Sequence, residues 1–210
     1  MRATFPLFQS HLDLAHDYWR RILQPNDQVI DATCGNGNDT LKLCQLLLSN
    51  GTGKVYVFDN QSDAIDKTKA LLREHLNLDQ FKQIHFILGC HSKFSDYVLP
   101  NTIKLIVYNL GYLPGGDKKK TTLTSTTLLS LQNSLNLIKP GGMICITCYP
   151  GHAEGLLEEK TLLKFALNLS PMEWSCCYHS WINRRQSPSL LLLQKTCQQS
   201  LHYPNPTTVL

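Results

Sequence analysis

The chain has 210 residues, a length that suits one α/β domain with a sizeable hydrophobic core. Its 20 basic and 16 acidic side chains give a formal net charge of +4, which permits a nucleic-acid partner without requiring one. There is no basic arm and no zinc-finger spacing, and no apolar run approaches the ~18–20 residues of a transmembrane helix.

Cysteine usage indicates a reducing compartment. The eight cysteines are scattered, and several fall inside apolar runs, as reduced core thiols do. Cys145 and Cys148 have the C-x-x-C spacing, but they lie in a predicted strand, where residues three apart point to opposite faces. We therefore expect no metal site there. Because nothing at the N-terminus resembles a signal peptide, we expect a soluble, cytoplasmic protein.

Apolar periodicity predicts strands that alternate with helices. A first helix is predicted over residues 11–23, ending before Pro25, and we expect it to lie against the sheet edge or to roof the ligand. Strands are then predicted over residues 28–33, 54–58, 83–88, 103–108, 143–149, 174–182 and 190–194. Further helices are predicted over residues 38–49, 62–76, 92–99, 121–137 and 153–169.

The alternation predicts a Rossmann-like, doubly wound α/β fold. We expect seven strands in a mostly parallel sheet, with helices on both faces. The last two strands are joined by a polar loop without a helix, so they should pair as an antiparallel hairpin at one edge. A single domain is predicted over residues 1–195, followed by a polar C-terminal tail at residues 196–210.

A glycine turn follows the first predicted strand. The apolar run stops at Asp31, the turn Gly35-Asn36-Gly37 comes next, and a helical pattern opens near Asn38. Strand, tight glycine turn and helix together form the nucleotide cradle of a βαβ unit. Glycines there let the backbone pass close under a ligand.

Two details favour S-adenosylmethionine as that ligand. Thr40 stands where a dinucleotide fingerprint has its third glycine, and the Asp31 carboxylate would repel a pyrophosphate. S-adenosylmethionine has no phosphate, and it carries a sulfonium and an ammonium. We expect Asp31 or Asp39 to bind that ammonium, directly or through water. A dinucleotide site and a glycine turn without a ligand are the alternatives.

The next two strand ends are expected to complete the donor site. Asp59 ends the second strand, where an acidic residue accepts hydrogen bonds from both ribose hydroxyls, and Asn60 and Gln61 would flank the adenine. Cys90 and His91 follow the third strand, near the adenine or the methyl group. His91 either makes a polar contact or caps the following helix.

The fourth strand ends in an Asn-x-x-Tyr sequence that is expected to hold the methyl acceptor. The Asn109 side-chain oxygen and the Leu110 carbonyl can each accept an N–H from a nitrogen nucleophile, which aims its lone pair at the methyl group. Tyr112 can stack on a planar substrate. Gly111 lies between them, and an ordinary strand-to-loop exit is the alternative.

Further substrate contacts are expected around the same rim. Gly115, Gly116 and Lys118 lie in a basic loop that would close over the acceptor or touch a phosphate, and a solvated lysine run is the alternative. His152 follows the fifth strand, and Arg185 lies at the tip of the last hairpin. Asp117, His152 or solvent would receive the proton that leaves the acceptor amine, and the sequence does not choose among them.

Together these segments resemble the class I S-adenosylmethionine-dependent methyltransferases of the putative rRNA methylase family, which includes the tRNA 5-aminomethyl-2-thiouridine methyltransferase MnmM. The resemblance covers roughly residues 10–195. Its most specific string is Asn-Leu-Gly-Tyr-Leu-Pro-Gly-Gly-Asp at 109–117. The other matching segments are residues 31–40, 139–142 and 149–152 and the spacing of Tyr178, Asn183 and Pro188. Cys34 and Cys90 depart from the family pattern.

The resemblance implies methylation of the aminomethyl nitrogen at the wobble uridine of certain tRNAs, and it makes a homodimer plausible. A methyltransferase that acts on rRNA or on a protein amide is the alternative within the same enzyme class. An NAD-dependent oxidoreductase and a catalytically inactive RNA-binding module are alternatives from other classes.

Overall fold

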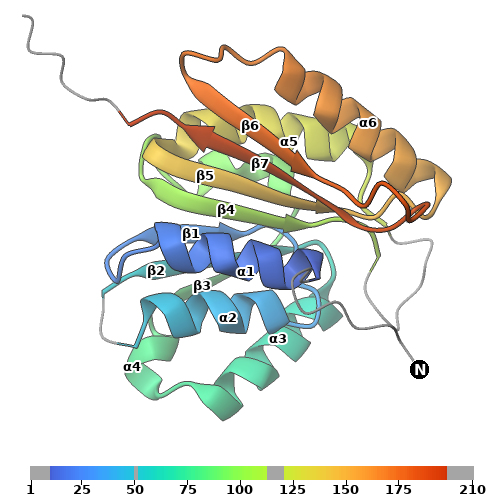
Figure 1. Cartoon of the computed structure of the whole chain (residues 1–210). Coiled ribbons are helices and arrows are strands. Elements are labelled where there is room, and N and C mark those ends of the chain that lie inside the picture. The colour runs from blue at the N-terminus through green and yellow to red at the C-terminus, as the bar shows by residue number, and fades with distance from the viewer. Residues whose placement is uncertain (1–9, 50–51, 113–120, 198–210) are drawn as a thin grey trace, which may run out of the picture.

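The computed structural model describes residues 10–49, 52–112 and 121–197 (Figure 1). Its centre is a seven-stranded sheet with the order β3-β2-β1-β4-β5-β7-β6. Neighbours among the first five strands are parallel, whereas β7 pairs antiparallel with both β5 and β6. The strands are β1 (Gln28–Asp31), β2 (Lys54–Asp59), β3 (Ile84–Leu88), β4 (Ile103–Asn109), β5 (Ile138–Cys148), β6 (Trp174–His179) and β7 (Ser189–Lys195).

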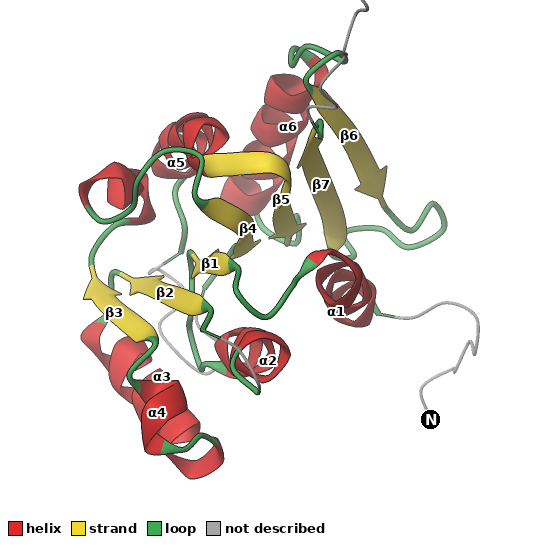
Figure 2. Cartoon of the chain, turned by 90° about the vertical axis from the view of Figure 1, so that its left-hand side faces the viewer, coloured by secondary structure: helices red, strands yellow, loops and turns green. Residues whose placement is uncertain are grey.

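Helices cover both faces of the sheet, which Figure 2 shows nearly edge-on, with α1 and α2 on one side and α5 and α6 on the other. The helices are α1 (His11–Ile22), α2 (Asn38–Leu47), α3 (Ser62–His75), α4 (Leu78–Phe81), η1 (His91–Asp96, a 3-10 helix), α5 (Thr124–Leu137) and α6 (Ala153–Leu167). The predicted fold class, with its antiparallel edge hairpin, is therefore confirmed.

The buried side chains form two clusters, one on each face. The first contains Trp19 and Leu43, and the second contains Leu131 and Leu162. Cys145 belongs to the first cluster and Cys148 to the second, so the C-x-x-C pair points to opposite faces of β5 as predicted.

Three element predictions were wrong in detail. The strand predicted over residues 143–149 already begins at Ile138, so residues 139–142 lie inside β5, where the pairing with β4 shifts register and Gly141 has a φ of 69°. The helix expected at 92–99 is the 3-10 helix η1. The short helix α4 was not predicted, although Asn77 and Gln80 form a capping box at its start.

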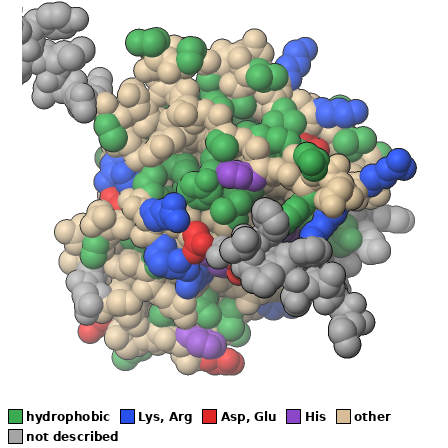
Figure 3. Space-filling model, in the orientation of Figure 1, with side chains coloured by type: hydrophobic (Ala, Val, Ile, Leu, Met, Phe, Trp, Pro, Cys, Tyr) green, Lys and Arg blue, Asp and Glu red, His purple; other side chains and the backbone are tan. Residues whose placement is uncertain are grey.

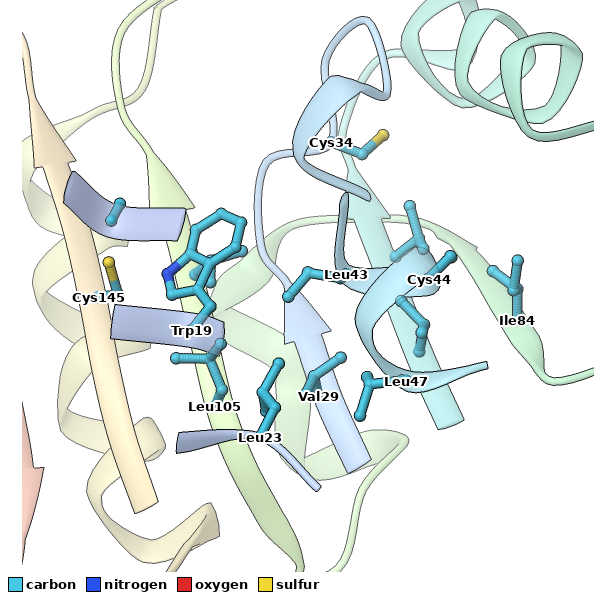
Figure 4. Packing of buried hydrophobic residues seen from close by; sticks show 14 of the residues in the cluster. Trp19, Leu23, Val29, Cys34, Leu43, Cys44, Leu47, Ile84, Leu105 and Cys145 are labelled. Carbon is cyan, nitrogen blue, oxygen red and sulfur yellow. The ribbon is translucent and has the colours of Figure 1, made fainter. Parts of the chain in front are cut away.

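Helix α1 is anchored on the first cluster. It begins after Ser10, whose hydroxyl accepts a hydrogen bond from the Asp13 backbone N–H at 3.2 Å. The Trp19 side chain is 2% exposed, and Figure 4 shows it beside Leu105 of β4 and Cys145 of β5. Such burial of a large aromatic side chain fixes the helix against the sheet. Within the described ranges, no helix is both long and apolar enough to cross a membrane.

Candidate functional site

The site lies where the strand order reverses. β1 pairs with β2 on one side and with β4 on the other, and a parallel α/β sheet binds its ligand beyond the carboxyl ends of the strands at such a point. Asp31, Asp59 and Asn109 end these three strands. The structure therefore brings together the polar residues that the sequence placed at separate strand ends.

The loop after β1 needs glycine at both predicted positions. Gly35 and Gly37 have φ values of 54° and 85°, in the left-handed region that disfavours a side chain. A Cβ at Gly37 would also lie 2.9 Å from the Cα of Thr68 in α3. The loop is thus a close-packed cradle. Asn36 is partly exposed at its tip.

Asp59 fixes the shape of this loop. One carboxylate oxygen accepts a hydrogen bond from the Gly35 N–H at 3.1 Å, and the other accepts one from the Gln61 N–H at 3.0 Å. A carboxylate has about four acceptor positions, so Asp59 keeps capacity for ribose hydroxyls. Asn60 is exposed and Gln61 is partly exposed at the same turn.

Asp31 is buried behind the loop rather than on its surface. Asp31 is only 1% exposed. Its carboxyl oxygens accept hydrogen bonds from the Thr40 hydroxyl at 2.5 Å and from the Thr33 N–H at 3.2 Å. Burial is the main reason that its pKa is raised to about 7, and the charges of Asp39 and Asp59 add to the rise. Thr40, at the position where a dinucleotide fingerprint has its third glycine, therefore donates a hydrogen bond to the buried Asp31 carboxyl.

Asp39 holds the acceptor asparagine. Its side chain is 15% exposed, and its two oxygens contact His16 Nε2 at 2.8 Å and Asn109 Nδ2 at 3.1 Å. Because a carboxylate only accepts, the Asn109 amide must turn its NH₂ group toward Asp39. The Asn109 side-chain oxygen is then the end that remains to receive a substrate N–H, as the predicted role requires.

Three site residues were missed by the sequence analysis. His11 and His16 project from α1, and His11 Nε2 lies 3.2 Å from the hydroxyl of Tyr149, just beyond β5. Burial is the main reason that the pKa of Tyr149 rises to about 12, with a contribution from Asp39, while a hydrogen bond with the Asn109 side chain opposes the rise. Tyr149 lies in residues 149–152, one of the segments that resemble the family. The helical periodicity of residues 11–23 did not indicate that α1 carries polar site residues.

Hydrogen bonds that lead to Glu158 of α6 hold the segment after β4. Gly111, whose φ is 113°, donates its N–H to the Thr122 hydroxyl at 3.0 Å, and that hydroxyl donates to the buried Glu158 carboxylate at 2.9 Å. Tyr112 forms an isolated antiparallel bridge with Thr121. Leu110 is buried. The Asn-x-x-Tyr segment is therefore fixed on both sides of the adjoining loop.

His91 does not cap the following helix, so that alternative was wrong. It is buried at the start of η1, with its ring 5.8 Å from that of Tyr108, and the cap position is Cys90, which makes no side-chain cap bond. Burial lowers the pKa of His91 to about 4. Cys90 accepts a hydrogen bond from the Ser92 hydroxyl at 3.1 Å. Contact of Cys90 or His91 with a donor remains a prediction.

His152 is the cap of α6. Its Nδ1 accepts a hydrogen bond from the Gly155 N–H at 3.1 Å, and its ring lies 6.1 Å from that of Tyr112. The neutral ring therefore carries its hydrogen on Nε2. Arg185 is exposed in the β6–β7 loop, beside Arg184, which stacks 4.2 Å from the Trp181 ring. The predicted roles of Gly115, Gly116, Asp117 and Lys118 fall outside the described residues, as does most of the predicted tail.

The charges at this edge fit a cationic ligand. Burial is the main cause of the raised pKa of Asp31, and Asp39 and Asp59 lie close enough for their charges to add to that rise. Among the described residues, the basic side chain in contact with these carboxylates is His16, whose Nε2 lies 2.8 Å from an Asp39 oxygen. Carboxylates so placed attract a sulfonium and an ammonium and repel a pyrophosphate. The residues present therefore fit S-adenosylmethionine better than a dinucleotide.

Comparison with known proteins gives the same assignment. Residues 55–195 match the model of the family described as "Putative rRNA methylase". The chain belongs to this family. It is 37% identical over 187 residues to the Arabidopsis thaliana protein named tRNA (mnm(5)s(2)U34)-methyltransferase, chloroplastic, an alignment that covers 87% of this chain and 68% of the relative.

Solved structures of a putative rRNA methylase and of a putative methyltransferase share the fold. A putative rRNA methylase from Clostridium thermocellum has a TM-score of 0.83 at 32% identity, covering 90% of this chain and 98% of its own. A putative methyltransferase from Streptococcus mutans, solved in complex with SAH, has a TM-score of 0.79 at 31% identity, covering 90% and 99%. The predicted family and its methyltransferase class are confirmed, and S-adenosylmethionine is the methyl donor that these findings support.

Proposed function

We propose that this methyltransferase converts 5-aminomethyl-2-thiouridine to 5-methylaminomethyl-2-thiouridine at the wobble position of tRNA. The observation that carries the proposal is the hydrogen bond from Asn109 Nδ2 to Asp39, which leaves the amide oxygen to accept from an amine. The plant relative, named for a modification of this nucleoside, supports the same acceptor.

One group of residues would bind the methyl donor, and another would bind the acceptor nucleoside. S-adenosylmethionine supplies the methyl group. Gly35, Gly37 and Asp59 form the cradle in which its nucleoside would lie, and the nearby carboxylates favour its cationic end. Asn109 would orient the amine so that its lone pair faces the methyl carbon. Proximity and orientation can lower an activation barrier by roughly 7–11 kcal/mol in total, and this contact would supply several kcal/mol of that. Tyr112 would stack on the uracil ring.

The partner we propose is the anticodon region of tRNA. Lys118 and Arg185 are the basic residues proposed to contact its phosphates. On the face shown in Figure 3, lysine and arginine side chains are dispersed rather than joined in one patch, so phosphate contacts would be few. A homodimer and a cytoplasmic location belong to the same proposal, although the plant relative is named as chloroplastic.

The family description favours one second candidate, which is methylation of rRNA. The same Asn-x-x-Tyr geometry would present a base amine instead of an aminomethyl group. A protein amide would fit that geometry equally well on chemical grounds.

Methyl transfer to synthetic anticodon stem-loops tests the proposal. With S-adenosylmethionine present, a stem-loop that carries the aminomethyl group should gain one methyl on its exocyclic nitrogen, and the same stem-loop without this group should gain none. Equal transfer to both, or transfer only to rRNA, would contradict the proposal. Calorimetry supplies a further check, because saturable binding of NAD with none of S-adenosylmethionine would exclude the methyltransferase altogether.

A further inference from the structure

If the proposed function holds, the acceptor amine must lose a proton before it can react. A primary alkyl amine resembles the lysine side chain, whose pKa is about 10.4, so most of it is protonated at neutral pH. An ammonium has no lone pair and cannot attack the methyl group. One proton must therefore leave the nitrogen before transfer, and the group that takes it must lie near Asn109.

The described residues offer one connected route from this position. The Tyr149 hydroxyl interacts with the Asn109 side chain on one side and lies 3.2 Å from His11 Nε2 on the other. The two rings meet edge to face, with centroids 5.6 Å apart and an interplanar angle of 88°. Both residues are partly exposed, so the route begins at the acceptor asparagine and reaches the molecular surface.

The other groups near Asn109 are less suited to take the proton. Asp39 already accepts hydrogen bonds from Asn109 and contacts His16. Both Asp39 oxygens are therefore occupied, and a proton on either one would compete with a contact that the oxygen already makes. His152 has its acceptor nitrogen engaged by the Gly155 N–H, so protonating that atom would break the cap of α6.

We propose that the Tyr149 hydroxyl and the His11 imidazole form a relay that removes a proton from the acceptor ammonium before methyl transfer. Helix α1 would thereby complete the acceptor side of the site. His11 is positioned for this by the burial of Ala15 and Trp19, which hold the same helix against the sheet.

The step balances in protons and electrons. An N–H bond of the ammonium breaks, its electron pair stays on nitrogen as the lone pair, and the proton moves to the Tyr149 oxygen. At the same time the original Tyr149 hydroxyl proton moves to His11 Nε2, so Tyr149 ends neutral and His11 ends as imidazolium. His11 then returns its proton to solvent. The lone pair attacks the methyl carbon, and the carbon–sulfur bond pair leaves with sulfur.

The charges around His11 keep this relay open at neutral pH. Burial lowers the pKa of His11, while Asp13 on its own helix and Asp39 on α2 oppose that shift, and Tyr149 faces His11 from the segment just after β5. His11 is thus an unprotonated acceptor above its lowered pKa. As the pH falls through that value the relay closes, because an imidazolium cannot accept a second proton.

Single-turnover methyl transfer tests the relay. The aminomethyl stem-loop and saturating S-adenosylmethionine are mixed with wild type, His11→Gln or Tyr149→Phe, and the rate is followed from about pH 5 to about pH 9, a range that spans the ordinary histidine pKa. We expect each variant to lose about 10²-fold in rate at neutral pH, the lower part of the range for general acid–base catalysis. Donor affinity should be little changed. His75→Gln, at an exposed histidine of α3, is the matched control and should keep the wild-type rate.

The profile and a rescue separate the relay from a structural effect. The wild-type rate should level off above the His11 pKa, whereas the His11→Gln rate should keep rising with hydroxide. Added imidazole should partly restore His11→Ala. Wild-type rates and profiles in both His11→Gln and Tyr149→Phe, or loss of donor binding in both, would overturn the relay and leave the proposed function standing. A wild-type protein that methylates no stem-loop would instead overturn the proposed function.

Discussion

The residue that decides the chemistry of the site is Asn109, and its neighbours determine which end of its amide faces the substrate. Asp39 takes the NH₂ end, and the Thr33 hydroxyl accepts from the Asn109 backbone N–H at 2.8 Å. Loss of the Asp39 contact would let the side-chain amide rotate, whereas the Thr33 contact holds the backbone of Asn109. A substrate amine requires an acceptor at this point, so orientation matters as much as residue identity.

Asn109→Ala and Asp59→Ala should therefore fail in opposite ways. Asn109→Ala should remove most methyl transfer, on the order of 10²–10³-fold as for loss of one transition-state hydrogen-bonding group, and leave donor affinity nearly intact. Asp59→Ala should weaken the donor first, because it removes a carboxylate that also shapes the Gly35 loop. Isothermal calorimetry with S-adenosylmethionine, combined with turnover measurements, separates the two effects. A collapse of donor affinity in Asn109→Ala would show that its role has been misassigned.

Some site residues could be identified from the sequence, and others could not. Strand ends identified Asp59 and Asn109 because parallel strands bring their carboxyl ends together. Asp31 or Asp39 was predicted to bind the donor ammonium, and sequence does not show that the Asp31 side chain is buried with hydrogen bonds from Thr40 and Thr33. His16 was missed because its partner is 23 residues away on a different helix.

At the scale of elements, helix α1 links stability to the site. It carries His11 and His16 toward the acceptor and buries Trp19 against β4 and β5 (Figure 4). The sequence predicted this helix well because its apolar residues repeat at helical spacing. It did not predict that β5 begins at Ile138, because a Pro-Gly-Gly string normally ends regular structure, whereas here pairing with β4 overrides that tendency.

Truncation of Trp19 tests this anchoring. Trp19→Ala should lower the free energy of unfolding by about 3–5 kcal/mol, because it leaves a cavity between α1 and the sheet. Leu167→Ala, at a side chain 85% exposed at the end of α6, should change it by less than about 0.5 kcal/mol. Urea denaturation measures both variants. Equal stabilities for the two would mean that α1 is not held by Trp19.

At the scale of the whole molecule, a three-layer fold of two apolar clusters surrounds a small polar edge, and the burial of Asp31 couples stability to pH. The pKa of Asp31 is raised in the folded state to about 7, while an unfolded aspartate has a pKa of about 3.9. Between these values the folded protein holds the extra proton. Stability is therefore greatest at low pH as far as this group is concerned, and it falls as the pH rises toward 7.

Urea midpoints of the donor-free protein at several pH values test this coupling. Wild type should lose stability from about pH 4 to about pH 7, by roughly 1.4 kcal/mol for each unit of pKa shift, and Asp31→Asn should show a flatter dependence. Glu74→Gln, which alters an exposed carboxylate of α3, should keep the wild-type slope. A wild-type slope in Asp31→Asn would mean that Asp31 is not the buried acid responsible.

The central claim is methyl transfer to the wobble nucleoside of tRNA, and mass spectrometry of nucleosides tests it most directly. Transfer RNA is compared from cells that contain this protein and from otherwise identical cells that lack it. The account predicts that 5-methylaminomethyl-2-thiouridine is replaced by 5-aminomethyl-2-thiouridine when the protein is absent, and that Asn109→Ala fails to restore it. An unchanged wobble nucleoside in tRNA from cells without the protein would contradict the account.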